Sequence, residues 1–103
     1  MAYGVIVENR EMSDDSAHEV FEHVRRTGPV PPEGCRLMLA GPADPGTHIV
    51  SVWDSQDALQ RFFAERLGPA YAAAGLSLDR ITRTLFEVHT LVAGDLTGAP
   101  QPA

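Results

Sequence analysis

The stretch HIVSVWDSQDALQRFFAERLGPAYAAAGL, residues 48–76, decides the fold of this chain. Residues 48–53 are rich in β-branched and aromatic side chains and predict a strand. Asp54 and Ser55 end that strand, and Ser55 is the predicted N-cap of a helix. The apolar residues that follow recur at helical spacing: Ala58, Leu59, Phe62, Phe63 and Leu67. The stretch therefore predicts a strand that leads into an amphipathic helix with an aromatic-rich buried face.

The second half of this stretch predicts a broken helix. Gly68-Pro69 interrupts the helical pattern, because proline lacks the backbone N–H that a helix interior needs. Residues 70–74 are expected to form a further short helical piece, and Gly75 is expected to cap it in the left-handed conformation.

The flanking segments complete one domain over residues 1–93. Ser13 is expected to cap a first helix, whose apolar positions recur at i, i+3, i+4 and i+7: Ala17, Val20, Phe21 and Val24. Apolar or β-branched runs predict three more strands, at 3–8, 35–40 and 81–93. The order β-α-β-β-α-β is ferredoxin-like and predicts an α+β fold, a four-stranded antiparallel sheet with both helices on one face. Residues 94–103, rich in Gly, Pro and Ala, are expected to be a flexible tail.

The turn formers at 41–46 predict a hairpin between the strands on either side. A turn centred on residues 43–46 places Leu39 near Val50, Leu37 near Val52 and Met38 near Ser51. One sheet face then carries Leu37, Leu39, Val50 and Val52, and the other carries Met38, Ala40, Ile49, Ser51 and Trp53. Neither face is polar and the helices cover only one, so a second copy of the chain is the expected cover for the other. The sequence thus predicts a homodimer through the sheet face, and leaves open which face lines a pocket.

Composition excludes several classes of function. Lys plus Arg number 8 against 14 Asp plus Glu, and the net charge of −6 includes no basic cluster longer than Arg25-Arg26, so nucleic acid is not an expected partner. The single Cys35 excludes an internal disulfide, and no Cys/His spacing resembles a zinc site. His18 and His23 lie about 140° apart around a helix and form no metal pair. Neither a signal sequence nor an 18-residue apolar run is present, so we expect a cytoplasmic protein that does not enter a membrane.

Four short motifs make the chain resemble a known superfamily. They are Gly4-Val5-Ile6-Val7-Glu8, Leu39-Ala40-Gly41-Pro42, Val52-Trp53-Asp54-Ser55 and Arg66-Leu67-Gly68-Pro69-Ala70. With them the chain is similar to the dimeric α+β barrel proteins, particularly the small antibiotic-biosynthesis-monooxygenase-like proteins of actinobacteria. The resemblance implies a barrel across a dimer, with an apolar pocket between helices and sheet in each protomer. Such proteins include cofactor-independent oxygenases, polyketide cyclases, haem-degrading enzymes and proteins without known activity, so the fold alone does not fix the reaction.

The chain departs from these relatives at two places. They often carry a histidine two residues before the Ala-Gly-Pro turn, where this chain has Met38, and His48 is the nearest replacement. The resemblance implies that haem degradation needs an Asn, a strand Trp and a haem-ligating His on the second helix. Asn9 and Trp53 match the first two, but residues 56–67 contain no histidine. We therefore expect no haem, and no other cofactor or metal.

The candidate site residues fall into two groups. His48 and His89 are candidate bases, and Trp53 is a candidate donor to a developing oxyanion. The candidate substrate-binding residues are Asn9, Met38, Ser51, Phe62 and Tyr71. For each of them an ordinary core, turn or solvent-facing role is the competing interpretation.

Two function hypotheses follow. The first is a small-molecule enzyme of specialised metabolism that acts on an aromatic or polyketide-like substrate in an apolar pocket. A histidine would remove a proton, and the resulting anion would react with O₂ in a monooxygenase or with an internal carbon in a cyclase. The second is a non-catalytic dimeric ligand-binding or accessory protein that uses the same pocket. The sequence does not decide between His48 and His89 as the base, or identify the substrate.

Overall fold

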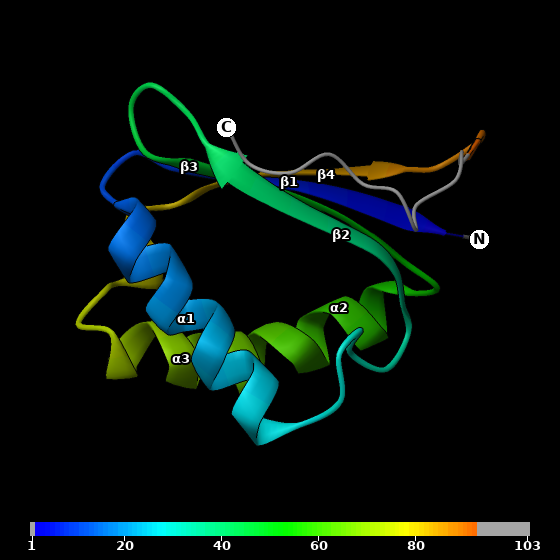
Figure 1. Cartoon of the computed structure of the whole chain (residues 1–103). Coiled ribbons are helices and arrows are strands. Elements are labelled where there is room, and N and C mark those ends of the chain that lie inside the picture. Colours follow the sequence, from blue (N-terminus) through cyan, green and yellow to red (C-terminus); the bar gives the residue numbers. More distant parts are fainter. Residues whose placement is uncertain (1, 93–103) are drawn as a thin grey trace.

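The computed structural model describes residues 2–92, and the predicted β-α-β-β-α-β order is confirmed (Figure 1). The elements in chain order are β1 (Tyr3–Asn9), α1 (Asp14–Thr27), β2 (Cys35–Pro42), β3 (Thr47–Trp53), α2 (Gln56–Phe62), a π-helical turn η1 (Phe63–Leu67), α3 (Gly68–Ala73), a 3₁₀ turn η2 (Leu78–Arg80) and β4 (Thr82–Glu87).

The strands form one antiparallel sheet in the order β2-β3-β1-β4. The predicted hairpin register is confirmed, since Leu39 pairs with Val50 and Met38 pairs with Ser51. All the helices lie on one side of this sheet, as Figure 1 shows. The sheet therefore has a helix-covered face and an outer face that no element of residues 2–92 covers.

The core fills the space between the helices and the covered face of the sheet. The predicted apolar stripe on the second helix is confirmed, because Leu59, Phe62, Phe63 and Leu67 are all buried. Both predicted N-caps are also confirmed: Ser13 Oγ accepts a hydrogen bond from the Ser16 amide, and Ser55 Oγ accepts one from the Ala58 amide, each at 3.1 Å.

The outer face of the sheet remains apolar and partly exposed. Leu39 is 54% exposed and Phe86 is 43% exposed. The Phe86 ring lies directly over Gly4, where a Cβ would come within 2.5 Å of a ring carbon. Packing along this face therefore depends on a glycine in β1, and large apolar side chains still face outward.

The helix does not end at Gly68-Pro69 as predicted. The chain stays helical from α2 through η1 into α3, and the amide of Gly68 donates to the carbonyl of Phe63, five residues back. Pro69 lies in the first turn of α3, and its missing N–H is tolerated beside this wider turn. The predicted cap at Gly75 is confirmed, since its φ is +74°.

The last strand is shorter than the predicted 81–93. Its final pair joins Glu87 to Tyr3, the first residue of β1, and one more hydrogen bond runs from the Val88 amide to the Ala2 carbonyl. β4 ends there because β1, its one neighbour within residues 2–92, has ended. Residue 93 and the tail predicted at 94–103 lie outside the described residues. Within residues 2–92, every helix is too short or too polar to span a bilayer.

Candidate functional site

A small cavity lies between the helices and the centre of the sheet. We call it the inner cavity; its lining residues are Val7, Phe21, Met38, Ile49, Ser51, Trp53, Phe62, Phe63 and Leu67. Its volume is about 10 Å³, which is enough for one water molecule at most. The inner cavity brings together four of the predicted site residues: Met38, Ser51, Trp53 and Phe62.

Ser51 and Trp53 form the polar part of the inner cavity. Both belong to β3 and point to the covered face, and they are 3% and 0% exposed. Trp53 Nε1 donates a hydrogen bond to Ser51 Oγ at 2.8 Å. The indole N–H is therefore already used, and the proton of the Ser51 hydroxyl is left to donate elsewhere. The sequence predicts that Trp53 donates to an oxyanion. With its N–H bonded to Ser51, that donation would come from the Ser51 hydroxyl instead.

Aromatic packing fixes the position of Trp53. Its ring lies 5.1 Å from the Phe62 ring, tilted by 37°, and Phe62 meets Phe63 edge-on at 6.2 Å. The sequence identified Phe62 as a candidate contact, but it did not single out Phe21, which α1 brings to the cavity. The only sequence signal for Phe21 was its place on the apolar stripe of that helix.

A second buried polar group lies in the same core, formed by Asn9 and Tyr71. They are 2% and 1% exposed. Asn9 Oδ1 accepts a hydrogen bond from the Glu11 amide at 3.0 Å, so this oxygen stabilises the turn after β1. The Tyr71 hydroxyl has no hydrogen-bond partner among the described residues. Burial raises the pKa of this phenol, and the nearby Asn9 side chain opposes that effect in part.

Neither candidate base borders the inner cavity. His48 is exposed on β3, where it pairs with Glu8 and Gly41 and points to the outer face of the sheet. His89 lies beyond the end of β4, is exposed, and places Nε2 3.4 Å from a carboxylate oxygen of Glu87. Within the described residues the inner cavity has no histidine, and a base role for either residue stays a prediction.

Cys35 is the one thiol in the chain and lies half-buried at the start of β2. Burial raises its pKa, a backbone hydrogen bond with Leu37 partly opposes the rise, and the Asp54 carboxylate adds to it. A thiol with a raised pKa is a poor nucleophile at neutral pH, because little of it is ionised. Cys35 is therefore not a candidate for covalent catalysis.

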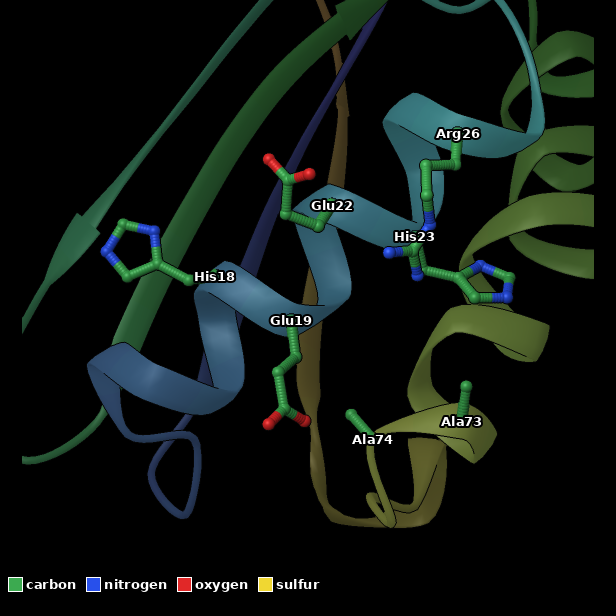
Figure 2. Close-up of a pocket in the computed structure, with 7 residues that line it drawn as sticks. All are labelled: His18, Glu19, Glu22, His23, Arg26, Ala73 and Ala74. Atoms are coloured by element: carbon green, nitrogen blue, oxygen red, sulfur yellow. The ribbon is translucent and has the colours of Figure 1, made fainter.

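The remaining histidines line an open groove of about 400 Å³ between α1 and α3 (Figure 2). Figure 2 shows the side chains of His18 and His23 pointing in opposite directions from α1, with only His23 on the α3 side. The groove carries charges of both signs, from Glu19, Glu22 and Arg26. Nowhere in residues 2–92 do three metal-ligating side chains come together.

No family model matches this chain, and no curated protein matches it. Solved structures do. SnoaB, a cofactor-independent oxygenase from Streptomyces nogalater, is 17% identical, with 90% of this chain and 97% of that chain covered and a TM-score of 0.59. The likeness is one of fold, and it agrees with the fold predicted from the motifs.

Two further solved structures agree with this result. A candidate antibiotic biosynthesis monooxygenase from Caulobacter crescentus is 18% identical, over 86% of this chain and 91% of that one, with a TM-score of 0.63. A dimeric ferredoxin-like protein of unknown function from Thermobifida fusca is 15% identical, over 85% and 92%, with a TM-score of 0.61. The predicted resemblance to antibiotic-biosynthesis-monooxygenase-like proteins is thus confirmed at the level of the fold.

Proposed function

We propose that this protein is a homodimeric enzyme that binds an aromatic, polyketide-like molecule in the inner cavity and oxygenates or cyclises it without a cofactor. The observation that carries the proposal is the Ser51–Trp53 pair, a polar group aimed into an otherwise apolar enclosure. The likeness in fold to an enzyme named as a cofactor-independent oxygenase supports the same class of chemistry.

Ser51 is the residue proposed to stabilise the reacting anion. Because its oxygen accepts from Trp53, its own O–H is not used in that bond and would donate to a substrate oxygen in the cavity. In the oxygenase version the enolate carbon forms a bond to O₂; the peroxide takes up a proton, and loss of water with the second hydrogen of that carbon leaves a carbonyl. In the cyclase version the same anion attacks a carbonyl carbon of the substrate; the C=O π bond breaks as the carbon–carbon bond forms, and the alkoxide takes up a proton.

The substrate must lose a proton in either version. His48 and His89 remain the proposed bases, but each would have to act from outside the inner cavity of the described chain. An enol flanked by carbonyl groups is acidic enough to enter as its anion, and then Ser51 needs only to stabilise it. The geometry therefore favours acidic enols and phenols over neutral hydrocarbons as substrates.

Dimerisation is proposed through the outer face of the sheet, where Leu39 and Phe86 are exposed. A solved structure of this fold is described as dimeric, which supports the proposal. Leu39→Glu is expected to convert the dimer to monomer in light scattering, since it places a charge in the interface. Ala72→Glu on the exposed side of α3 is the matched control and should remain dimeric. A monomeric wild type, or a dimeric Leu39→Glu variant, would contradict this interface.

The second candidate function is a non-catalytic ligand-binding or accessory role. It is favoured by one observation, that no histidine of residues 2–92 reaches the inner cavity. The test for both functions is a screen of aromatic polyketide-like compounds by the fluorescence of Trp53, the single tryptophan. Each binder is then incubated with ¹⁸O₂ or under nitrogen and its products are analysed by mass spectrometry.

The outcomes of that screen distinguish the oxygenase, the cyclase and the accessory role. Incorporation of ¹⁸O supports the oxygenase, and a product formed equally under nitrogen supports the cyclase. Binding without product supports the accessory role. If no compound changes the fluorescence of Trp53, the inner cavity is not the binding site.

A further inference from the structure

Two side chains separate the inner cavity from a larger groove on the surface. Phe21 of α1 and Met38 of β2 line both spaces. The outer space, here called the β2 groove, has a volume of about 470 Å³, and its border also includes Pro31, Arg36, Leu39 and Ala40. The wall between solvent and the Ser51–Trp53 pair is therefore only one layer of side chains thick at this place.

A ligand that enters the inner cavity requires this wall to move. Pockets for small organic ligands usually measure about 300 to 1,000 Å³, and the β2 groove alone falls within that range. The inner cavity, at about 10 Å³, does not. Met38 is the more adaptable of the two wall residues, because its unbranched side chain rotates about three bonds and tolerates repacking. Phe21 is less free to move, because it lies on α1 close to two buried residues of the same helix, Val20 and Val24.

Arg36 supplies a cation at the mouth of the β2 groove. Its guanidinium is more than half exposed, and its nearest acid, Asp54, lies 3.6 Å away with a similarly exposed carboxylate. A long and exposed ion pair of this kind contributes little to stability, so Arg36 can exchange it for an anionic ligand. The chain as a whole carries a net charge of −6, which makes a local cation decisive for the approach of an anion.

We propose that Met38 is the gate through which a flat aromatic anion passes from the β2 groove to Ser51 and Trp53, with Arg36 binding its anionic group at the mouth. The proposal rests on the proposed function, because it assigns the inner cavity to a ligand. It adds the route, the residue that controls it, and a negative charge on the ligand.

The gate is tested first without any ligand. Trp53 is the single tryptophan and is 0% exposed, so acrylamide quenches its fluorescence only by entering the core. Met38→Ala is expected to raise the bimolecular quenching constant several-fold, and Met38→Leu, of similar volume, to leave it near the wild-type value. Leu91→Ala is the matched control, since Leu91 is an exposed leucine that lines neither the inner cavity nor the β2 groove. Circular dichroism is used to confirm that each variant is folded under the conditions of the assay.

Two dyes then test the route and the charge. 8-Anilinonaphthalene-1-sulfonate and N-phenyl-1-naphthylamine share one ring system, and only the first carries a sulfonate. In stopped flow, Met38→Ala is expected to speed the association of both dyes. Arg36→Gln is expected to weaken binding of the sulfonate by about threefold and to leave the neutral dye unchanged. Dye that binds on the outer face of the sheet would respond to Phe86→Ala and not to Met38→Ala.

The results distinguish failure of the gate from failure of the proposed function. Acrylamide quenching that is unchanged in Met38→Ala, or raised equally in Leu91→Ala, overturns the gate even where both dyes bind in the core. Equal effects of Arg36→Gln on the two dyes overturn the role of the charge. If neither dye binds in the core but Met38→Ala still admits acrylamide, the role of Met38 as a gate is supported. The proposal that the inner cavity binds an aromatic anion is then wrong.

Discussion

Replacing Tyr71 by phenylalanine is expected to make the protein more stable. Tyr71 is 1% exposed, and its hydroxyl lacks a hydrogen-bond partner within residues 2–92. A buried hydroxyl without a partner costs about 1 to 3 kcal/mol, because it loses its bonds to water on folding. Phenylalanine keeps the ring and removes this cost. We therefore expect the free energy of unfolding to rise by about 1 kcal/mol or more in Tyr71→Phe.

The same substitution also changes the response of stability to alkaline pH. Burial raises the pKa of Tyr71 above its ordinary value of 10.0. Above pH 10.0 the unfolded chain therefore loses the phenolic proton while the folded protein keeps it, and wild-type stability falls as the pH rises. The slope for one such group is at most about 1.4 kcal/mol per pH unit. Tyr71→Phe lacks this phenol, so its advantage over the wild type widens in that range.

Urea unfolding followed by circular dichroism measures both effects, at neutral pH and at several alkaline values. Tyr3→Phe is the matched control, because it also removes a phenol but at a position that is only half-buried. A Tyr71→Phe variant less stable than the wild type would refute the reasoning. It would show that the hydroxyl makes a favourable hydrogen bond, for which the Asn9 side chain is the nearest candidate.

Two further stability predictions follow from the geometry. Ser51→Ala is expected to lower the free energy of unfolding by about 1 to 3 kcal/mol, because the buried Trp53 N–H loses its acceptor. An unchanged urea midpoint would mean that this N–H finds another partner. Gly46→Ala is expected to cost about 2 kcal/mol or more, since Gly46 has a φ of +89° and a Cβ would lie 2.0 Å from the Asn9 carbonyl oxygen. Gly75→Ala, with a φ of +74° and open space around the Cβ, should cost only about 1 kcal/mol, and equal losses in the two glycine variants would contradict the role of the clash.

The features that sequence reasoning predicted correctly depend on residues close together in the chain. The N-caps at Ser13 and Ser55 each join residues three apart. The β2-β3 register follows from a short turn and from the alternation of side chains, so pairing Met38 with Ser51 required no knowledge of the rest of the fold. Local chemistry therefore determines the elements and much of the sheet.

The features that were missed depend on distant partners. The side chain of Arg66 donates to the carbonyls of Val24 and Pro29 and so caps the end of α1, with the latter bond at 2.7 Å across 37 residues. The end of β4 at Glu87 depends on where β1 begins. Neither partner can be identified from the composition of the segment itself. For the same reason the sequence could not show which face of the sheet the helices cover, and therefore that Ser51 faces the core while His48 does not.

The position of each polar group limits the chemistry that the core can perform. The hydroxyls of Ser51 and Tyr71 are buried, and a hydroxyl can donate a hydrogen bond to an anion but is too weak a base to create one at neutral pH. The described interior is thus suited to stabilise a negative charge that arrives with the ligand. An anionic aromatic ligand satisfies this condition. A ligand of that charge also fits the position of Arg36, a cation that lines the β2 groove on the proposed route inward. The proposed substrate class and the proposed gate therefore rest on one physical requirement, which the pair of naphthyl dyes tests directly.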